Sequence, residues 1–149
     1  MRLRHLPLLW VAILPLIASA QQPQRENFTT KLAEQRHVPF SGAVRVGDTL
    51  YIAGTTAPDL GSRGAVSVEQ EAHLVMDEVK RLVERAGFKM DDLVSVQVFC
   101  TDLANYDAFN NVYRTYFHGG YPARSFIGTP TLLFGARFEV LGIAVRTGR

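Results

Sequence analysis

An apolar run near the end of the chain, 138–145 (FEVLGIAV), limits the fold more than any other segment. It has the length of a strand, and apolar residues occupy both of its alternating sets, so both faces of this strand should be covered. Glu139 shares one face with Leu141, Ile143 and Val145. A carboxylate on a mostly apolar surface is costly unless it has a partner or a function. Glu139 is therefore a candidate functional residue.

The segments before this run have the periods of strands and helices. Two strands are predicted at 43–46 and 49–54, joined by a turn at Gly47-Asp48. A helix opens at Ser67, whose spacing to Gln70 is that of a capping box, and closes at Gly87. A third strand should cover about 93–101, a second helix about 104–117, and a further strand should begin at Arg124.

This order of elements predicts an α+β fold, a single mixed sheet with two helices on one face. The other face of the sheet then has no cover within the chain. Because the last strand is apolar on both sides, the bare face should pack against other copies of the chain. We therefore expect an oligomer.

The N-terminal twenty residues have the features of a signal peptide. A basic start, an apolar stretch from Leu6 to Ile17 and the small-residue pattern Ala18-Ser19-Ala20 precede Gln21. The stretch is short for a membrane span and contains prolines, although an uncleaved anchor is an alternative. Cleavage would place the protein in a periplasm or outside the cell. Residues 21–37 are polar without a period and are expected to form a loose lead into a domain at 38–149.

Charge and composition exclude several functions. The leader holds two of the 16 basic residues and none of the 14 acidic ones, so the mature chain is neutral, with 14 of each. We therefore expect no nucleic-acid partner and, after cleavage, no membrane partner. The single cysteine, Cys100, excludes an internal disulfide and predicts a buried small residue. The four histidines have no metal-ligand spacing, so no metal site is expected.

Arg124 is the second candidate functional residue. It stands in the segment Pro122-Ala123-Arg124-Ser125, at the start of a strand. A guanidinium there could bind a small carboxylate through two hydrogen bonds, while a nearby glutamate moves protons or aligns a water. The alternatives are a structural ion pair for Arg124, and for Glu139 a carboxylate at a subunit seam, paired with Arg137 or Arg124.

Several segments resemble the RidA (YjgF-like) family, in order from about Val38 to Arg146. They are Pro39-Phe40-Ser41, Val46-Gly47-Asp48, Ala53-Gly54, 99–103 (FCTDL), 110–113 (NNVY), Pro122-Ala123-Arg124-Ser125, and Glu139 with Ile143-Ala144-Val145. The resemblance implies a chorismate-mutase-like fold and a homotrimer with clefts between subunits. It also implies hydrolysis of enamines and imines to 2-oxo acid and ammonia, without metal or cofactor.

By position, the resemblance makes Arg124 the carboxylate-binding residue and Glu139 the residue that positions water. Gly54 would line the cleft through its backbone, and Asn110 would lie near it, unless Asn110 is an ordinary polar helix residue. The sequence departs from the usual deaminase pattern where Phe40 replaces a tyrosine, Ala53 a serine and Phe126 a smaller residue. Phe40 and Phe126 are candidate substrate contacts, although packing roles are an alternative.

The resulting hypothesis is an exported RidA-like hydrolase of reactive enamines and imines of small carboxylates. Its ligands would be a carboxylate-bearing imine or a 2-oxo acid. The alternative is a non-catalytic trimeric module that binds small carboxylates. Glu139 favours the enzyme, whereas the departures at Phe40 and Ala53 favour the binding module.

Overall fold

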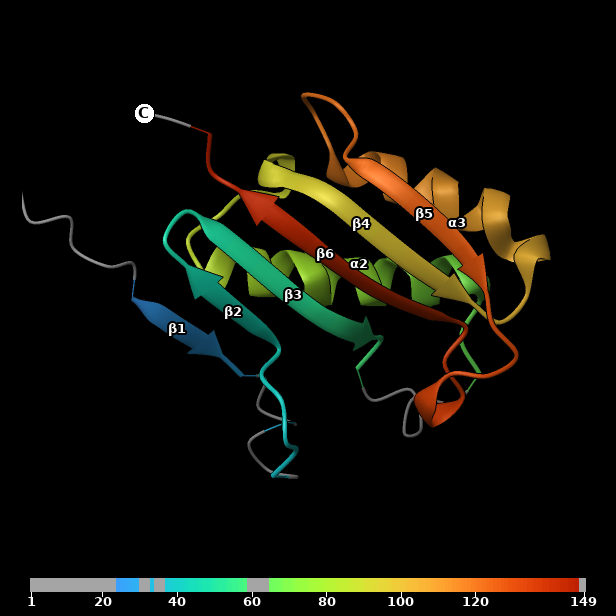
Figure 1. Cartoon of the computed structure of the whole chain (residues 1–149). Helices are drawn as coiled ribbons and strands as arrows, with labels where there is room; N and C mark the ends of the chain where they lie inside the picture. The colour runs from blue at the N-terminus through green and yellow to red at the C-terminus, as the bar shows by residue number, and fades with distance from the viewer. Residues whose placement is uncertain (1–23, 30–32, 34–36, 59–64, 148–149) are drawn as a thin grey trace, which may run out of the picture.

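A six-stranded sheet forms the centre of the molecule in a computed structural model that describes residues 24–29, 33, 37–58 and 65–147 (Figure 1). The strand order is β1-β2-β3-β6-β4-β5, and β4 and β5 are the parallel pair in an otherwise antiparallel sheet. The bounds are β1 (Arg25–Phe28), β2 (Ala43–Val46), β3 (Thr49–Thr56), β4 (Leu93–Cys100), β5 (Ala123–Gly128) and β6 (Phe138–Val145). The single mixed sheet is as predicted.

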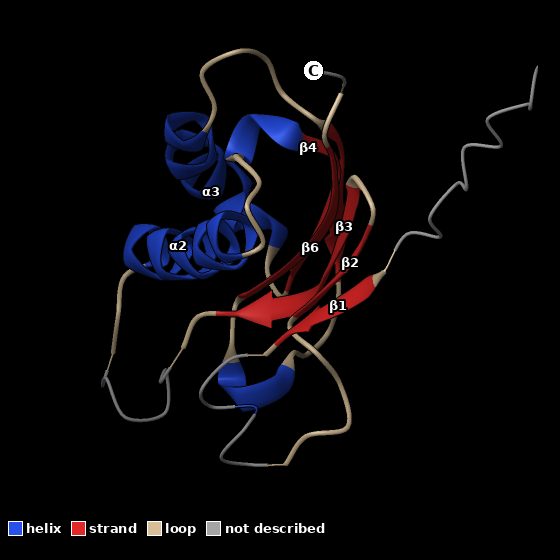
Figure 2. Cartoon of the chain, turned by 90° about the vertical axis from the view of Figure 1, so that its left-hand side faces the viewer, coloured by secondary structure: helices blue, strands red, loops and turns tan. Residues whose placement is uncertain are grey.

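Two helices cover one face of this sheet, as Figure 2 shows edge-on. Helix α2 (Val68–Arg85) begins at Ser67, whose side chain accepts from the backbone N–H of Gln70, while the Gln70 side chain accepts from Ser67. This is the predicted capping box. Helix α3 (Tyr106–Tyr113) lies between two short 3₁₀ turns, Leu103–Asn105 and Arg114–Tyr116. The predicted continuous helix over 104–117 is therefore correct in place but is regular α-helix only in its middle.

The core fills the space between the helices and the sheet. Alternate residues of the central strands point toward the helices, among them Leu50 of β3, Val98 of β4 and Val140 of β6. Cys100 continues the β4 set and is fully buried, as predicted, and burial raises the pKa of its thiol. Because β6 lies between β3 and β4, its apolar character on both sides suits a central strand.

The N-terminal lead is less loose than expected. Strand β1 pairs with β2 in antiparallel register from Arg25↔Val46 to Phe28↔Ala43. Its sequence, RENF, shows no apolar alternation because it is an exposed edge strand, held mainly by backbone hydrogen bonds. The predicted signal peptide at 1–20 lies outside the described residues. Among the described helices, none is both long and apolar enough to cross a membrane.

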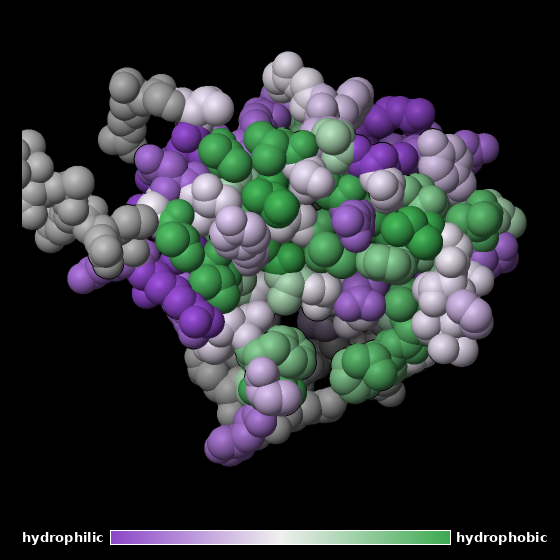
Figure 3. Space-filling view, viewed as in Figure 1, coloured by the Kyte–Doolittle hydropathy of each residue, from purple (hydrophilic) through white to green (hydrophobic). Residues whose placement is uncertain are grey.

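The face of the sheet opposite the helices carries a band of apolar side chains (Figure 3). Tyr51 pairs in register with Ile143, and Phe99 pairs with both Glu139 and Ile127. Tyr51 is 51% exposed and Ile127 is 38% exposed. We call this surface the open face. It is the bare apolar face that the sequence predicts.

Candidate functional site

The Arg124 side chain lies on the helix side of the sheet, under α3. Arg124 pairs in parallel register with Val96, a core residue. The Arg124 guanidinium donates a hydrogen bond of 2.7 Å from Nη2 to Oδ1 of Asn110. Asn110 is buried, with 7% of its surface exposed. Among the described residues, no carboxylate pairs with Arg124, so its remaining N–H groups can serve a ligand. Within this part of the chain, Arg124 therefore forms no structural ion pair.

Three aromatic rings surround this guanidinium. The Cζ atom of Arg124 lies 4.6 Å from the ring centroid of Tyr113, 5.6 Å from that of Phe126 and 5.8 Å from that of Tyr106. Phe126 shares the face of Arg124, as predicted, and packs edge-on against Tyr106. Rings at these distances attract the cation and restrict its rotamers. Arg124, Asn110, Tyr106, Tyr113 and Phe126 form what we call the arginine half-site.

A buried hydroxyl belongs to this half-site. The Tyr113 Oη atom is buried and has no hydrogen-bond partner within the described part of the chain. Burial raises the pKa of Tyr113 to about 12, against the opposing effect of nearby Arg124. The hydroxyl is therefore a neutral donor at physiological pH. A ligand oxygen bound at Arg124 could use it.

Glu139 lies on the open face. Its neighbours in β6, Phe138 and Val140, point into the core, and its register partners are Thr56 of β3 and Phe99 of β4. The carboxylate sits directly over Gly54, where any Cβ atom would overlap it. Gly54 stands in an irregularity of the β3–β6 pairing between Ile52 and Thr55. Only glycine leaves room for the carboxylate here, so Glu139 and Gly54 form what we call the glutamate half-site.

Arg137 does not pair with Glu139. Its Nη1 atom lies 2.6 Å from Oε2 of Glu71, in α2, so within one chain Arg137 is paired with Glu71 rather than with Glu139. No ion pair involves Glu139 among the residues that the structure describes. A carboxylate in such a position is a candidate general base.

Arg124 and Glu139 point to opposite faces of the sheet. In β4, Val96 and Val98 are buried against the helices, so Phe99 faces the other way. Arg124 pairs with Val96, whereas Glu139 pairs with Phe99. Residues that pair directly share a face. One chain therefore does not bring the predicted arginine and glutamate together.

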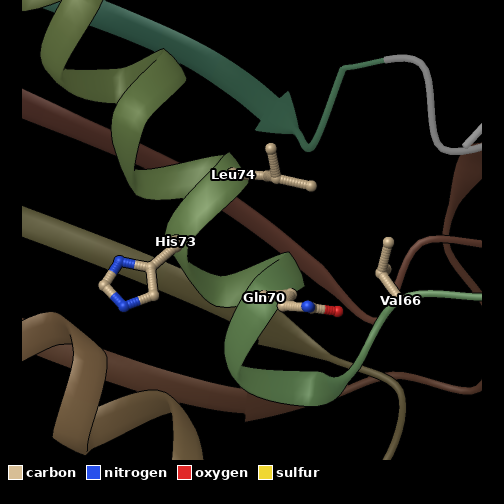
Figure 4. Close-up of a pocket in the computed structure, with 4 residues that line it drawn as sticks. All are labelled: Val66, Gln70, His73 and Leu74. Atoms are coloured by element: carbon tan, nitrogen blue, oxygen red, sulfur yellow. The ribbon is translucent and has the colours of Figure 1, made fainter.

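Phe40 belongs to neither half-site within one chain. It is 58% exposed, in the bend before β2, where the backbone of Gly42 accepts a hydrogen bond from Ala53. An open groove on the outer side of α2, lined by Val66, Gln70, His73 and Leu74, contains no predicted site residue (Figure 4). Among the described residues, no group of acidic, histidine and cysteine side chains could hold a metal ion.

Tyr106, Tyr113 and Glu71 are not among the functional residues predicted from the sequence. Tyr113 follows Asn110 by three residues, and this spacing places both on one face of a helix, a signal that was available. The role of Glu71 had no such signal. Its partner stands 66 positions away in the sequence.

Comparison with known proteins matches residues 30–146 to the family model described as Endoribonuclease L-PSP. A 2-iminobutanoate/2-iminopropanoate deaminase of Dermatophagoides farinae is 34% identical over 119 residues, which cover 78% of this chain and 93% of the relative. The protein of the same name from Mus musculus is 32% identical over 124 residues, covering 82% and 92%.

Solved structures share the fold. The E. coli TdcF structure with bound serine is 30% identical, with a TM-score of 0.69, and the match covers 74% of this chain and 90% of TdcF. The YjgF gene product of E. coli is 29% identical, with a TM-score of 0.68 and coverage of 73% and 89%. A member of the YjgF/YER057c/UK114 family from Mycobacterium tuberculosis has a TM-score of 0.73 at 20% identity, which supports the fold alone.

Proposed function

The chain belongs to the Endoribonuclease L-PSP family of RidA (YjgF-like) proteins, and we propose that it is an exported hydrolase of reactive enamines and imines of small carboxylates. The observation that carries the proposal is the pair of half-sites. A guanidinium held by Asn110 is free to bind a carboxylate, and a carboxylate without a cation lies over an exposed glycine. Relatives named 2-iminobutanoate/2-iminopropanoate deaminase support the same chemistry.

The reaction needs only binding, alignment and proton movement. The β-carbon of the enamine takes a proton, which leaves a C=N bond. Water then adds to the imine carbon, and Glu139 accepts a proton from this water. Glu139 passes this proton to nitrogen and the C–N bond breaks. The remaining hydroxyl proton goes to solvent as the C=O bond forms, which replaces the proton taken up at the β-carbon, and ammonia and the 2-oxo acid leave. Positioning contributes up to about 7–11 kcal/mol in favourable cases, so a bound carboxylate and an aligned water are enough for a reactive substrate.

The complete site would form between two copies of the chain. Arg124 lies on β5, the strand at the end of the sheet, whereas Glu139 lies on the open face. A homotrimer that buries the open face would bring Glu139 of one copy to Arg124 of the next. The apolar side chains of the open face support this assembly. Light scattering on the purified mature protein tests it, and a monomer at micromolar concentration would contradict it.

Phe126 should make this site narrow and dry. Its ring lies edge-on to Tyr106 and to Phe109, 5.0 and 5.5 Å away, and so occupies space beside the guanidinium. A substrate bound to Arg124 therefore meets aromatic surface rather than solvent. We infer a preference for imines with small side chains. The serine bound to E. coli TdcF is a ligand of this size in a related protein.

Export rests on the N-terminal sequence. Arg2 and Arg4, the apolar stretch and the small residues before Gln21 fit a cleaved secretion signal. In a periplasm or outside the cell, oxidation of amines or amino acids would be the class of reaction that supplies imines. N-terminal sequencing of the exported protein should find Gln21 first, and residues 1–20 still attached would refute cleavage.

The decisive experiment measures imine hydrolysis by the purified mature protein. An amino acid oxidase generates imines from a panel of amino acids, and decay of the imine is compared with the spontaneous rate. Acceleration supports the hydrolase. Binding of 2-oxo acids without acceleration on any imine would instead establish the carboxylate-binding module, which the departures at Phe40, Ala53 and Phe126 favour.

A further inference from the structure

Glu71 is a buried carboxylate that the proposed reaction does not use. It lies in the first turn of α2 and is 1% exposed. Its Oε1 atom accepts hydrogen bonds from the backbone N–H groups of Arg137, at 2.5 Å, and Phe138, at 3.3 Å. Its Oε2 atom binds the Arg137 guanidinium at 2.6 Å. These three hydrogen bonds and the N-terminus of α2 together stabilise the negative charge of the Glu71 carboxylate.

The partner of Glu71 stands next to the glutamate half-site. Arg137 directly precedes β6 and is two residues from Glu139. Its backbone carbonyl accepts from Thr101, and its Nη1 atom also donates to the carbonyl of Val66 at 3.2 Å. The Arg137 side chain is 37% exposed, so the guanidinium has room to move if its partner is removed.

We propose that Glu71 is a positioning residue that keeps Glu139 available for proton transfer by holding Arg137 and the entry to β6. This inference rests on the proposed function, because it assigns Glu71 a role in the same reaction. The backbone contacts hold Phe138 in the core, and alternation then directs Glu139 to the open face above Gly54. The ion pair retains the cation that stands nearest to Glu139 in the sequence.

Loss of the Glu71 charge should release Arg137 toward Glu139. A guanidinium paired with a catalytic carboxylate stabilises its charged form and makes it a weaker base. Glu71→Gln is the suitable variant, because the amide oxygen can still accept from the backbone while the charge is lost. Substrate binding should survive, because Arg124 is held by Asn110 of α3, whereas Glu71 is bound to Arg137.

The kinetic test uses five variants of the mature protein. Glu71→Gln should lower kcat by about tenfold or more, with the affinity for a 2-oxo acid unchanged. Adding Arg137→Met should restore most of the rate, because neither charge is then left without its partner. Glu71→Gln should have little further effect in a Glu139→Gln background. The matched control is Glu84→Gln, which removes an exposed carboxylate of the same helix, paired with Lys80 at 3.7 Å.

A spectroscopic measurement separates this inference from the proposed function. In ¹³C-labelled protein, the carboxyl resonance of Glu139 should move in Glu71→Gln, return in Glu71→Gln/Arg137→Met and stay in place in Glu84→Gln. This holds whether or not the protein hydrolyses imines. A resonance that does not move in Glu71→Gln overturns the inference and leaves the proposed function standing.

Two further results would also overturn it. One is an equal fold decrease in kcat when Glu71→Gln is introduced into wild type and into Glu139→Gln, which would show a general structural effect. The other is a double variant with Arg137→Met that stays as slow as Glu71→Gln. If Glu71→Gln alone does not fold, the double variant decides the matter, because a rate near wild type supports the inference and a rate near that of Glu139→Gln refutes it.

Discussion

Arg124 and Glu139 occupy opposite faces of the sheet, with only β4 between their strands. The helices cover the arginine side, and the glutamate side is open. Because the two groups share no contact within one chain, replacing one should leave the surroundings of the other intact. Binding and chemistry can therefore be tested separately.

Arg124→Ala should weaken the binding of a 2-oxo acid. Each lost hydrogen bond to a charged group costs about 1.5–3 kcal/mol, or about 10- to 150-fold in affinity. Isothermal titration with pyruvate measures this loss. Arg114→Ala is the matched control, since Arg114 also donates to an asparagine, Asn111, but from the exposed end of α3. Equal affinity in Arg124→Ala and wild type would remove Arg124 from the site.

Glu139→Gln should bind a 2-oxo acid as wild type does and lose most of its rate. The amide keeps the size of the side chain but cannot accept a proton from water, and acid–base groups contribute roughly 10²- to 10⁴-fold. Single-turnover hydrolysis of an oxidase-generated imine gives the chemical rate. If this variant is as fast as wild type, another group moves the proton.

Gly54→Ala should lower kcat clearly while it changes the thermal unfolding of the protein little. The new methyl group would occupy the place of the Glu139 carboxylate, which must then turn away. Gly119→Ala is the control, because a methyl group there meets no atom within 4 Å. Thermal unfolding and kcat measured on both variants check the prediction. An unchanged kcat in Gly54→Ala would show that the carboxylate acts from a different position.

The sequence predicted those elements whose signals are local. The capping box at Ser67 and Gln70 and the turn at Gly47 each depend on residues within one element or turn, and the structure contains both. Strand β1 was missed because an edge strand needs backbone partners rather than an apolar pattern. Its pairing with β2 is not encoded in RENF alone.

The relation between the two half-sites could not be predicted in the same way. Alternation correctly places Phe126 with Arg124 and Leu141 with Glu139. The relative face of Arg124 and Glu139, however, depends on two strand registers, both with β4, which lies between them. A shift of one residue in either register would reverse the result. For the same reason, the long-range pairing of Glu71 with Arg137 had no sequence signal.

Tyr113→Phe should raise the free energy of unfolding by about 1 kcal/mol, because it removes a buried hydroxyl without a described partner. It should also change the response to alkali. The pKa of Tyr113 is raised to about 12 in the folded protein, so the unfolded chain ionises at a lower pH than the folded one. The free energy of unfolding is therefore unaffected by ionisation of this group below about pH 10 and falls as the pH rises toward 12. Tyr113→Phe should therefore lose less stability over this range.

Urea unfolding at several pH values measures both effects. Tyr121→Phe is the control, because Tyr121 is 64% exposed. If a ligand uses the Tyr113 hydroxyl, Tyr113→Phe will be more stable yet bind pyruvate more weakly. A Tyr113→Phe protein that is less stable than wild type at neutral pH would show that the hydroxyl has a partner, such as a buried water.

Mixing two inactive variants tests whether the site is shared between copies. Neither Arg124→Ala nor Glu139→Gln should hydrolyse imines well alone. If both are unfolded and refolded together in equal amounts, a site needs an intact Arg124 from one copy and an intact Glu139 from its neighbour. In random assembly, one copy supplies an intact Arg124 with a probability of one half, and its neighbour supplies an intact Glu139 with the same probability. About one quarter of the wild-type rate should therefore return.

The control mixes Arg124→Ala with the double variant Arg124→Ala/Glu139→Gln. No copy in that mixture has Arg124, so no rate should return, although the chains assemble in the same way. Recovery in the first mixture and none in the control would place Arg124 and Glu139 of each working site on different chains. If the first mixture also stays inactive, the two groups do not meet across an interface. The opposite faces that they occupy within one chain would then exclude joint action on one substrate.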